Sequence, residues 1–407
     1  MRDTPASPSF WRSPLRGPWL TSVLGLVLLV GITMLFVTGL VSYAAYNPGL
    51  APVNDKTPDK GILGFYLFAW PTDPHWLYRL TQGVHVTLGV TLIPVLLAKL
   101  WSVVPKLFAL PPARSLTHAL ERVSLLLLVG GGLFEFVTGV LNVQLDYLFP
   151  GSFYPLHFYG AWVFFAAFVA HAVLKVPAAV RNVRRAREEG ELVAPRPDPP
   201  TVSRRGALWF VGGGSLLLFG TTAGQSFDGP LRRTALLAPH GGADPGTGPN
   251  GFQINKTAAY AGIDRAETAE DAWRLVVVGR SGRTVRLSRT ELSQLPLHSS
   301  ALPIACVEGW STSDQWWRGV RLRDLAALVG HDGDPPDVLV ESLQRRGAFR
   351  HAALRANQVS DPRSLLALYV NGEALSADHG YPARVIVPAA PGVLNTKWVA
   401  RLTFGKV

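Results

Sequence analysis

Apolar and polar positions lie in long blocks over the first 227 residues. Four stretches contain no Lys, Arg, Asp or Glu: 17–45, 80–98, 147–174 and 206–227. A fifth apolar stretch, 123–145, contains one charged residue, Glu135. About 20 consecutive apolar residues are enough to cross the hydrocarbon core of a bilayer as a helix. We therefore expect an all-α bundle of five transmembrane helices near residues 19–41, 82–104, 121–143, 156–176 and 207–225.

From about residue 252 the pattern becomes that of a globular, strand-rich α+β domain. Strands are expected at 273–278, 284–287, 384–387 and 398–402. The first two are separated by Arg280-Ser281-Gly282, which predicts a hairpin. Ser288 and Glu291 have the spacing of a capping box at the start of a short helix. Asn371-Gly372 marks a further tight turn. About 150 residues can bury a hydrophobic core without disulfides or other cross-links.

Charge decides the orientation of the spans. The net charge is +11, but the loops on one side carry 15 Lys and Arg and those on the other side carry three. This positive-inside pattern places the N-terminus in the cytoplasm and residues after 227 outside, in an inner or plasma membrane. Residues 228–407 have 21 basic and 17 acidic side chains, which argues against a nucleic acid as partner. Charged residues make up 16% of the chain and apolar residues 48%, which excludes a disordered protein.

Composition also marks two linkers. Residues 181–206 are basic and then Pro-rich, and 228–251 are rich in Gly and Pro. The expected domains are therefore a four-helix membrane domain, a cytoplasmic linker, a fifth transmembrane helix, a flexible linker and an extracytoplasmic domain. Their expected bounds are 1–180, 181–206, 207–227, 228–251 and 252–407.

Four histidines in the membrane half are placed as two pairs. His157 and His171 lie at the two ends of the fourth span and are 14 residues apart. This separation is about 21 Å along a helix and brings both side chains to nearly the same face. By depth, His85 is level with His157 on the outer side, and His118 with His171 on the inner side. Such pairs have the separation that two haems stacked across a bilayer require.

A plainer interpretation is that these histidines are hydrated at the membrane interface. We expect this role for His75, which is followed by aromatic residues. Glu135 lies within a span, where polar groups are costly and usually functional. It either carries protons near a quinone or forms a hydrogen bond within the bundle.

The histidine spacing over residues 19–180 resembles that of membrane cytochromes b of the b561 and formate-dehydrogenase gamma-subunit type. The resemblance implies that paired histidines bind one or two haems b. On this interpretation His85, His157, His118 and His171 ligate haem iron, and a membrane quinone or quinol is the partner.

The exported domain contains the chain's single cysteine, Cys306. One cysteine excludes an intramolecular disulfide, a Cys-rich zinc site and a cysteine-ligated iron–sulfur cluster. A lone cysteine is usually a small buried apolar residue, although its thiolate is a soft metal ligand. Residues from 379 onward can supply a cationic clamp for a phosphate, supported by backbone amides. This clamp would contain His379, Arg384, Asn395, Thr396 and Lys397.

At about residues 250–407 the chain resembles the sulfite oxidase family of molybdopterin enzymes. The matching segments are Cys306-Val307-Glu308-Gly309-Trp310-Ser311, Asp361 to Leu366, Asn371-Gly372-Glu373, His379 to Arg384, and Lys397-Trp398. The resemblance implies a Mo-molybdopterin cofactor whose metal is ligated by the catalytic Cys306. It implies that His379, Arg384 and Lys397 grip the pterin phosphate. Asn255 and Lys256 fall where the family has a pterin-contacting motif, and Ser342 is a further contact.

The sequence also departs from sulfite oxidases proper. The segment before the cysteine reads Ile-Asn-Lys in place of Arg-Asn-His, and no Arg follows Cys306 before Arg318. A cationic pocket for sulfite is therefore in doubt, and the domain is nearer to the periplasmic methionine sulfoxide reductase branch. We expect an enzyme that exchanges electrons between quinone, haem b and molybdenum and reduces a small S- or N-oxide. A redox partner protein is a further candidate partner. The alternatives are a sulfite dehydrogenase that donates electrons to quinone and a cofactor-free, membrane-anchored binding module.

Residues 203–208, Ser-Arg-Arg-Gly-Ala-Leu, resemble a twin-arginine export signal directly before the fifth span. A domain that acquires its cofactor in the cytoplasm would need to be exported in the folded state. The alternative is an ordinary positively charged flank.

Overall fold

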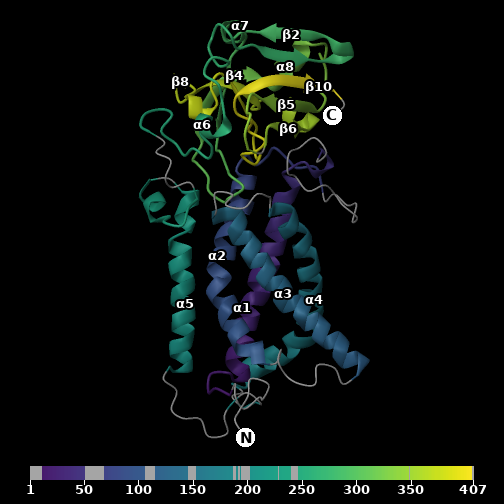
Figure 1. Cartoon of the computed structure of the whole chain (residues 1–407), viewed down its shortest axis with the longest axis vertical. Coiled ribbons are helices and arrows are strands. Elements are labelled where there is room, and N and C mark those ends of the chain that lie inside the picture. Colours follow the sequence, from purple (N-terminus) through teal and green to yellow (C-terminus); the bar gives the residue numbers. More distant parts are fainter. Residues whose placement is uncertain are drawn as a thin grey trace. The chain divides into compact units, whose positions relative to one another are not determined.

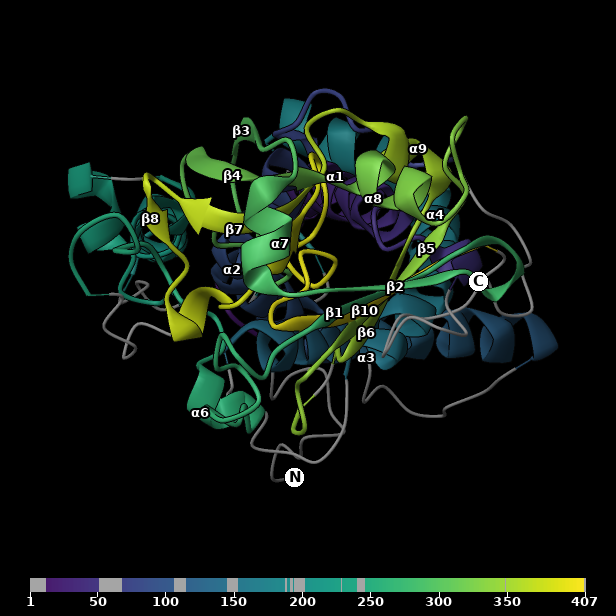
Figure 2. The ribbon, with the colours of Figure 1, turned by 90° about the horizontal axis from the view of Figure 1, so that it is seen from above.

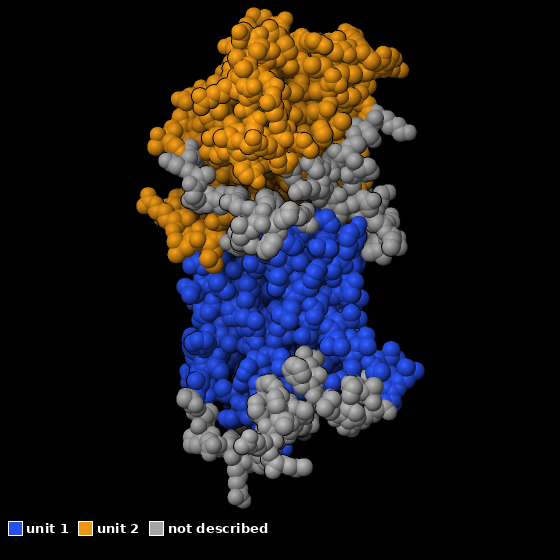
Figure 3. Space-filling model, in the orientation of Figure 1, with its two compact units in different colours: residues 1–37, 85–142, 149–222 blue, residues 38–84, 143–148, 223–407 orange. Residues whose placement is uncertain are grey.

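The computed structural model of the chain is shown in Figure 1. It describes residues 12–50, 68–105, 115–144, 153–186, 189, 190, 193, 202–227, 229–239, 246–347 and 349–405. The chain forms two compact units, coloured separately in Figure 3. Unit 1 comprises residues 1–37, 85–142 and 149–222, and unit 2 comprises 38–84, 143–148 and 223–407. The domain bounds expected from the sequence stay predictions.

Unit 1 is a bundle of long helices. They are α1 (Pro18–Ala44), α2 (Leu77–Val103), α3 (Leu116–Gln144), α4 (Tyr154–Arg184) and α5 (Arg204–Gly220). The last residues of α1 and the first residues of α2 belong to unit 2. Among the residues that the structure describes, five helical segments are long and apolar enough to cross a membrane, at the positions expected from the sequence.

The core of unit 1 follows from the spacing of its apolar residues. Leu20, Leu24, Leu28 and Ile32 recur every fourth residue and so form one stripe along α1. This stripe packs against apolar residues of α2 and against two phenylalanines of α4, which are Leu92, Val95, Leu96, Phe164 and Phe168. Most other side chains of these helices are apolar as well, as expected for helices surrounded by lipid.

Helix α4 continues to Arg184, eight residues beyond the expected end of its span at 176. Arg181 and Arg184, which lie beyond the expected span, are therefore part of the helix. Positive side chains in a last turn interact favourably with the negative end of the helix dipole, which explains the extension.

The C-terminal part of unit 2 is built from two five-stranded sheets. In the first sheet the strand order is β2-β1-β10-β5-β6, and in the second it is β3-β4-β7-β8, with β9 also pairing with β7. Strand β1 pairs parallel to β10, whereas β1 and β2 form an antiparallel hairpin. Figure 2 shows β2, β1 and β10 side by side. The strands are β1 (Leu275–Val278), β2 (Thr284–Leu287), β3 (His298–Leu302), β4 (Gln315–Arg321), β5 (Val338–Ser342), β6 (His351–Leu354), β7 (Leu365–Val370), β8 (Glu373–Ala374), β9 (Arg384–Ile386) and β10 (Val399–Phe404).

Four short helices accompany the sheets: α6 (Ala258–Ala261), α7 (Arg289–Gln294), α8 (Leu322–Leu328) and α9 (Ala356–Ser360). The capping box expected at Ser288 and Glu291 is present at the start of α7. Asn371 and Gly372 both have positive φ in the turn between β7 and β8, as their residue types predict. The fold class expected from the sequence, a helical bundle followed by a strand-rich α+β domain, is confirmed.

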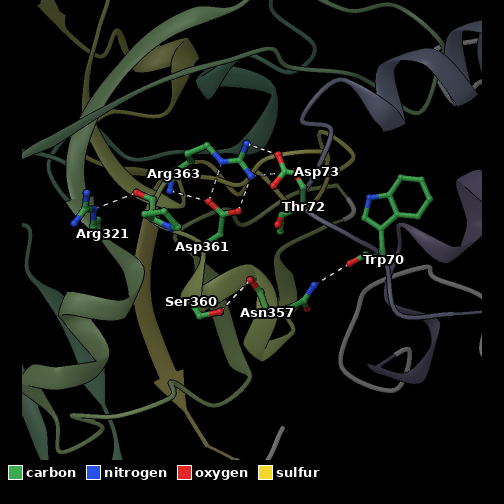
Figure 4. Close-up of polar contacts among 9 residues, drawn as sticks. Trp70, Thr72, Asp73, Arg321, Asn357, Ser360, Asp361 and Arg363 are labelled. Atoms are coloured by element: carbon green, nitrogen blue, oxygen red, sulfur yellow. Dashed lines mark hydrogen bonds and ion pairs between the residues drawn. The ribbon is translucent and has the colours of Figure 1, made fainter.

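Unit 2 also includes residues from the N-terminal half of the chain. The side chain of Asn357, in α9, donates a hydrogen bond to the carbonyl of Trp70 at 2.9 Å. The guanidinium of Arg363 joins the carboxylates of Asp73 and Asp361, each at 2.7 Å (Figure 4). The indole of Trp70 donates to the carbonyl of Ala389 at 2.7 Å. Residues 68–84 are therefore part of this unit through specific polar contacts.

Candidate active site

Cys306 lies in the connection between β3 and β4, where a tight turn holds its backbone. Its N–H donates to the carbonyl of Trp310 at 2.8 Å, and its own carbonyl accepts from the N–H of Gly309 at 3.1 Å. Gly309 has a φ of 91°, a conformation that favours glycine. The preceding residue, Ala305, forms isolated bridges with residues on both sides, Ser311 and Pro391. The thiol is thus fixed in a buried position by backbone contacts, with 4% of the residue exposed.

The carboxylate of Glu308 lies beside this thiol. One of its oxygens accepts hydrogen bonds from Cys306 Sγ at 3.3 Å and from the indole of Trp310 at 2.9 Å. Burial first, and then the negative charge of Glu308, raise the pKa of Cys306 well above its usual value. A bound metal cation reverses this preference, because a thiol that coordinates a metal gives up its proton. The site therefore suits a metal-bound thiolate better than a free nucleophile.

Arg384 is the first residue of β9 and is buried. Its two terminal nitrogens donate to the carbonyls of His379 and Asn395, each at 3.1 Å. Its guanidinium also lies over the ring of Trp317, 5.3 Å from the centroid. Trp317 belongs to the same apolar cluster as Cys306, so this cluster joins the cation to the cysteine segment.

His379 and Lys397 lie next to Arg384 in the fold. His379 ends the 3-10 helix η7 (Ala377–His379), where its Nε2 donates to the carbonyl of Asn250 at 2.7 Å. Its ring stacks on Phe252, with centroids 3.9 Å apart. The ammonium of Lys397 donates to the carbonyls of Lys256 and Asp378, both at 2.8 Å.

Burial disfavours the protonated forms of all three side chains, and neighbouring positive charge adds to this effect at His379 and Lys397. Burial lowers the pKa of Arg384 to about 9. Burial, followed by the charges of Arg384 and Lys397, lowers the pKa of His379 to about 3. Burial and then Arg384 likewise hold the pKa of Lys397 well below its usual value. A bound anion would favour the protonated forms of these side chains. The arrangement therefore has the character of an anion site.

The site also contains buried polar atoms without a hydrogen-bond partner in the described part of the chain. These are Arg384 Nε, Asn395 Nδ2 and Thr396 Oγ1. Buried donors of this kind are normally satisfied, so a ligand with acceptor oxygens is expected there. Gly380 has a φ of 110°, and a Cβ at its position would lie 3.0 Å from Lys397 Cβ and 3.1 Å from Arg384 Cβ. Glycine thus permits the close approach of the two cationic residues, and the whole set fits a phosphate.

Ser342, Lys256 and Asn255 were also expected in this site. Two of them contact Lys397 through hydrogen bonds. Ser342, at the end of β5, donates its hydroxyl to the carbonyl of Lys397 at 2.7 Å and so supports the backbone beside the cation. Lys256 contributes its carbonyl to the ammonium of Lys397. Asn255 is half-buried in the segment before Lys256. Phe252 and Gly380 were not singled out from the sequence, because a ring stack and a close backbone approach have no local signature.

The family model named oxidoreductase molybdopterin binding domain matches residues 261–407, which include this whole cluster apart from its N-terminal contacts. Residues 261–407 belong to this family. The matched range thus contains Cys306, the basic residues His379, Arg384 and Lys397, and the buried donors that have no partner among the described residues. The resemblance to the sulfite oxidase family is confirmed for this part of the chain.

Two relatives and one solved structure give the extent of the similarity. Mitochondrial sulfite oxidase of Rattus norvegicus is 32% identical over 158 residues, covering 33% of this chain and 29% of that protein. The uncharacterized oxidoreductase YuiH of Bacillus subtilis is 31% identical over 134 residues, covering 33% of this chain and 66% of that protein. The sulfane dehydrogenase SoxCD of Paracoccus pantotrophus aligns at 24% identity and a TM-score of 0.30, over 33% of this chain and 39% of that chain. This chain therefore spans less than a third of the length of the sulfite oxidase.

The described residues of the chain contain no group of three or more His, Cys, Asp or Glu side chains arranged to hold a metal ion. A metal bound at Cys306 would therefore need further ligands from outside these side chains.

In unit 1 the rings of His85 and His157 lie close together, with centroids 6.2 Å apart and planes at 85°. Nδ1 of His85 donates to the carbonyl of Leu35 at 3.0 Å. Nδ1 of His157 lies 3.2 Å from a carboxylate oxygen of Glu135 and 3.0 Å from the hydroxyl of Thr138. Histidines that bind metals commonly use one ring nitrogen for such a second contact and the other for the metal.

The structure describes less of the inner histidine pair, His118 and His171. His118 lies within α3, but its side chain is outside the described residues. His171 lies within α4 and is half-buried. His75, expected at the membrane interface, lies 3.3 Å from a carboxylate oxygen of Asp314 in unit 2.

Proposed function

We propose that this chain is a membrane-bound, molybdopterin-dependent oxidoreductase that exchanges electrons between a quinone, haem b and an extracytoplasmic molybdenum site. The observation that carries the proposal is the cluster of buried Arg384 and His379 with half-buried Lys397, where buried donors have no hydrogen-bond partner among the described residues. Such a set is costly to maintain without an anion. This set lies in a molybdopterin-binding domain, and the apolar cluster beside it contains the buried Cys306. Both facts support the phosphate of the cofactor as the anion that binds here.

The residues of this chain then have separate tasks. Cys306 would ligate the molybdenum as a thiolate, and Glu308 would keep the indole N–H of Trp310 fixed beside it. Arg384, Lys397 and His379 would hold the phosphate. When bound, the cofactor supplies the two-electron redox chemistry, while the protein provides ligation, orientation and exclusion of water.

The membrane part would supply the electron connection to the lipid phase. His85 and His157 are the candidate ligands of one haem b, supported by their proximity and by the second contact of each ring. The second pair, His118 and His171, remains the proposed site of a second haem. The positive-inside pattern favours a cytoplasmic N-terminus and an extracytoplasmic C-terminal domain.

We further propose that the substrate is a small neutral S- or N-oxide, which the enzyme reduces with electrons from quinol. Glu308 places a buried carboxylate beside Cys306, which disfavours an anionic substrate. Arg318, the first arginine after the cysteine, is exposed on β4, whereas its neighbour Trp317 is buried. Successive residues of a strand point to opposite faces, so Arg318 faces away from the Trp317 side.

A sulfite dehydrogenase that donates electrons to quinone is the second candidate. The 32% identity to rat sulfite oxidase favours it. The two candidates predict opposite results in one assay of the purified membrane protein. Reduced quinol analogues are supplied with a panel of sulfoxides and N-oxides, and haem reduction by sulfite is followed separately.

Turnover of an oxide at quinol expense supports the reductase. Rapid haem reduction by sulfite, with no turnover of any oxide, decides for the dehydrogenase. Metal analysis and an optical spectrum of the same preparation test the cofactors. A protein without molybdenum would reject both activities in favour of a cofactor-free binding module.

A further inference from the structure

The segment that follows Cys306 is bound directly to helix α2. The side-chain amide of Gln82 donates a hydrogen bond to the carbonyl of Val307 at 2.5 Å. Val307 is the residue after the cysteine, and Gln82 lies in the second turn of α2. The two residues are 225 positions apart and belong to the same compact unit. The contact therefore joins the metal-ligand segment to a helix from the other end of the chain.

A second contact lies one residue further along the helix. A Cβ at Gly83 would be 3.0 Å from the hydroxyl of Ser226 and 3.8 Å from the carbonyl of Gly309. Ser226 donates this hydroxyl to the Gly309 carbonyl at 3.2 Å, and its own carbonyl accepts from Arg79 at 2.6 Å. Glycine at 83 thus allows α2 to approach the cysteine turn closely. Arg79, Gln82 and Gly83 together form a surface on α2, here called the α2 seat.

Further hydrogen bonds attach the segments before the α2 seat to the C-terminal part of unit 2. The preceding segment is fastened to the molybdopterin-binding domain by Trp70, Asp73 and Arg363 (Figure 4). The side chain of Asn47, at the end of the α1 region, donates to the carbonyl of Ala353 at 3.1 Å and to Gln358 at 2.8 Å. These contacts involve α9, β6 and the residues after β9, far in sequence from Cys306. The α2 seat is therefore one of several contacts between residues 47–83 and the C-terminal part of unit 2.

Helix α2 also contains His85, three residues after Gln82. Three residues correspond to about 4.5 Å of rise and slightly less than one turn. We propose that Gln82 is a positioning residue that couples the Cys306 segment to the helix carrying His85, so that electron exchange between molybdenum and haem depends on its hydrogen bond. The inference rests on the proposed function, because it requires a haem on His85. In the step itself one electron leaves one centre, which is oxidised, and enters the other, which is reduced, and no bond is made or broken.

The test compares three variants of the full-length protein. Gln82→Met removes the donor while nearly keeping the volume of the side chain. Gly83→Ala requires the Ser226 hydroxyl to move by a few tenths of an ångström and is a second, independent change in the α2 seat. Thr81→Val is the matched control, because Thr81 lies on the same helix but its hydroxyl contacts Ser42 and the Tyr78 carbonyl.

Amide hydrogen exchange of residues 307–311 measures the contact without any cofactor chemistry. Loss of one hydrogen bond of about 1 kcal/mol should make this exchange roughly five-fold faster in Gln82→Met. Haem reduction by a photo-excited deazaflavin, followed by absorbance, measures how fast the electron then equilibrates with molybdenum. Equilibration should be several-fold slower in Gln82→Met and in Gly83→Ala, with haem and molybdenum contents unchanged. Thr81→Val should match the original protein in both measurements.

The outcomes separate the two proposals. A preparation that lacks haem rejects the relay but leaves the exchange measurement to decide whether Gln82 holds the segment. Faster exchange with unchanged electron equilibration overturns the coupling and leaves a structural contact. Unchanged exchange in Gln82→Met overturns the positioning role altogether. If Gln82→Met does not fold, Gln82→Glu, which keeps the shape of the side chain but replaces the amide donor, is judged by the same criteria.

Discussion

The guanidinium of Arg384 lies 5.3 Å above the ring of Trp317, while its two terminal nitrogens donate to backbone carbonyls. A planar fork is needed to make the two hydrogen bonds and the ring contact together. Lysine has the same charge but a compact ammonium. The geometry of this residue, in addition to its charge, is therefore expected to matter for holding the cofactor.

The first prediction follows for Arg384→Lys. We expect the variant to fold but to bind molybdopterin more weakly, by about 2 kcal/mol for a lost charge-assisted hydrogen bond. This corresponds to roughly 30-fold in affinity. Pterin content after dialysis measures the effect. The matched control is Arg318→Lys, an exposed arginine of β4, and equal pterin loss in both variants would argue against the specific role.

Cys306→Ser tests the metal ligand. Serine retains the size of the side chain but is a harder, weaker ligand for molybdenum than a thiolate. We expect activity to fall to background and molybdenum content to drop at least ~10-fold, with the thermal unfolding temperature little changed. Elemental analysis and a melting curve check this. Full activity with stoichiometric molybdenum would refute the assignment.

His157→Ala tests the haem site. The change removes a candidate axial ligand and leaves the Glu135 carboxylate without its imidazole partner. The optical spectrum of the purified membrane protein should lose the Soret absorbance of one haem b. Glu135→Gln is the companion variant, and it should retain the haem because it keeps the axial ligand. A spectrum of His157→Ala identical to that of the original protein would contradict the prediction.

Acid sensitivity is expected at Asp361. Burial raises the pKa of this carboxyl, but the hydrogen bonds and charge of Arg363 outweigh burial and hold the pKa below its usual value. Its contribution to stability is therefore complete above the ordinary carboxyl pKa of about 4 and is lost as the pH falls further. Asp361→Asn should lower the free energy of unfolding by about 2 kcal/mol at pH 7, because it loses charged hydrogen bonds.

The difference from the original protein should shrink below about pH 4 in denaturant titrations. Asp73→Asn is the control, because Asp73 meets the same arginine with its side chain 75% exposed. Exposed ion pairs contribute at most about 1 kcal/mol. A pH-independent effect of Asp361→Asn would mean that its charge is not the cause.

Export of the folded domain is expected to depend on Arg204 and Arg205. Both begin helix α5, and Ser203 caps that helix by accepting the N–H of Gly206 at 3.0 Å. Replacing both arginines with lysine keeps the positive flank but removes the twin-arginine pair. Protease treatment of intact spheroplasts should then leave the C-terminal domain uncut. Normal accessibility of the domain in the double variant would favour an ordinary flank.

What could be predicted from the sequence was mainly local. The hairpin of β1 and β2, the capping box at Ser288 and the turn at Asn371-Gly372 each depend on residues within a few positions. The five apolar helices follow from length and hydropathy. Physical interactions over short sequence distances suffice for these features.

The remaining features depend on contacts between distant segments. The stack of Phe252 on His379 joins residues 127 positions apart, and nothing in either residue type specifies it. The attachment of Gln82 to Val307 is equally invisible in the sequence, because a glutamine near the start of an apolar helix gives no sign of a partner 225 residues away. The cysteine and the cations were found through a resemblance, while their mutual geometry came from the fold.

The anion site of the molybdopterin-binding domain is expected to affect how much of the protein accumulates in the cell. A ligand that binds the folded state alone adds its binding free energy to stability, and an empty anion site lacks that contribution. Chains without cofactor should therefore unfold more often and be removed by proteases sooner than loaded ones. The steady-state amount of this protein would then follow the supply of cofactor, and starvation for molybdate would appear first as a shortage of the polypeptide itself.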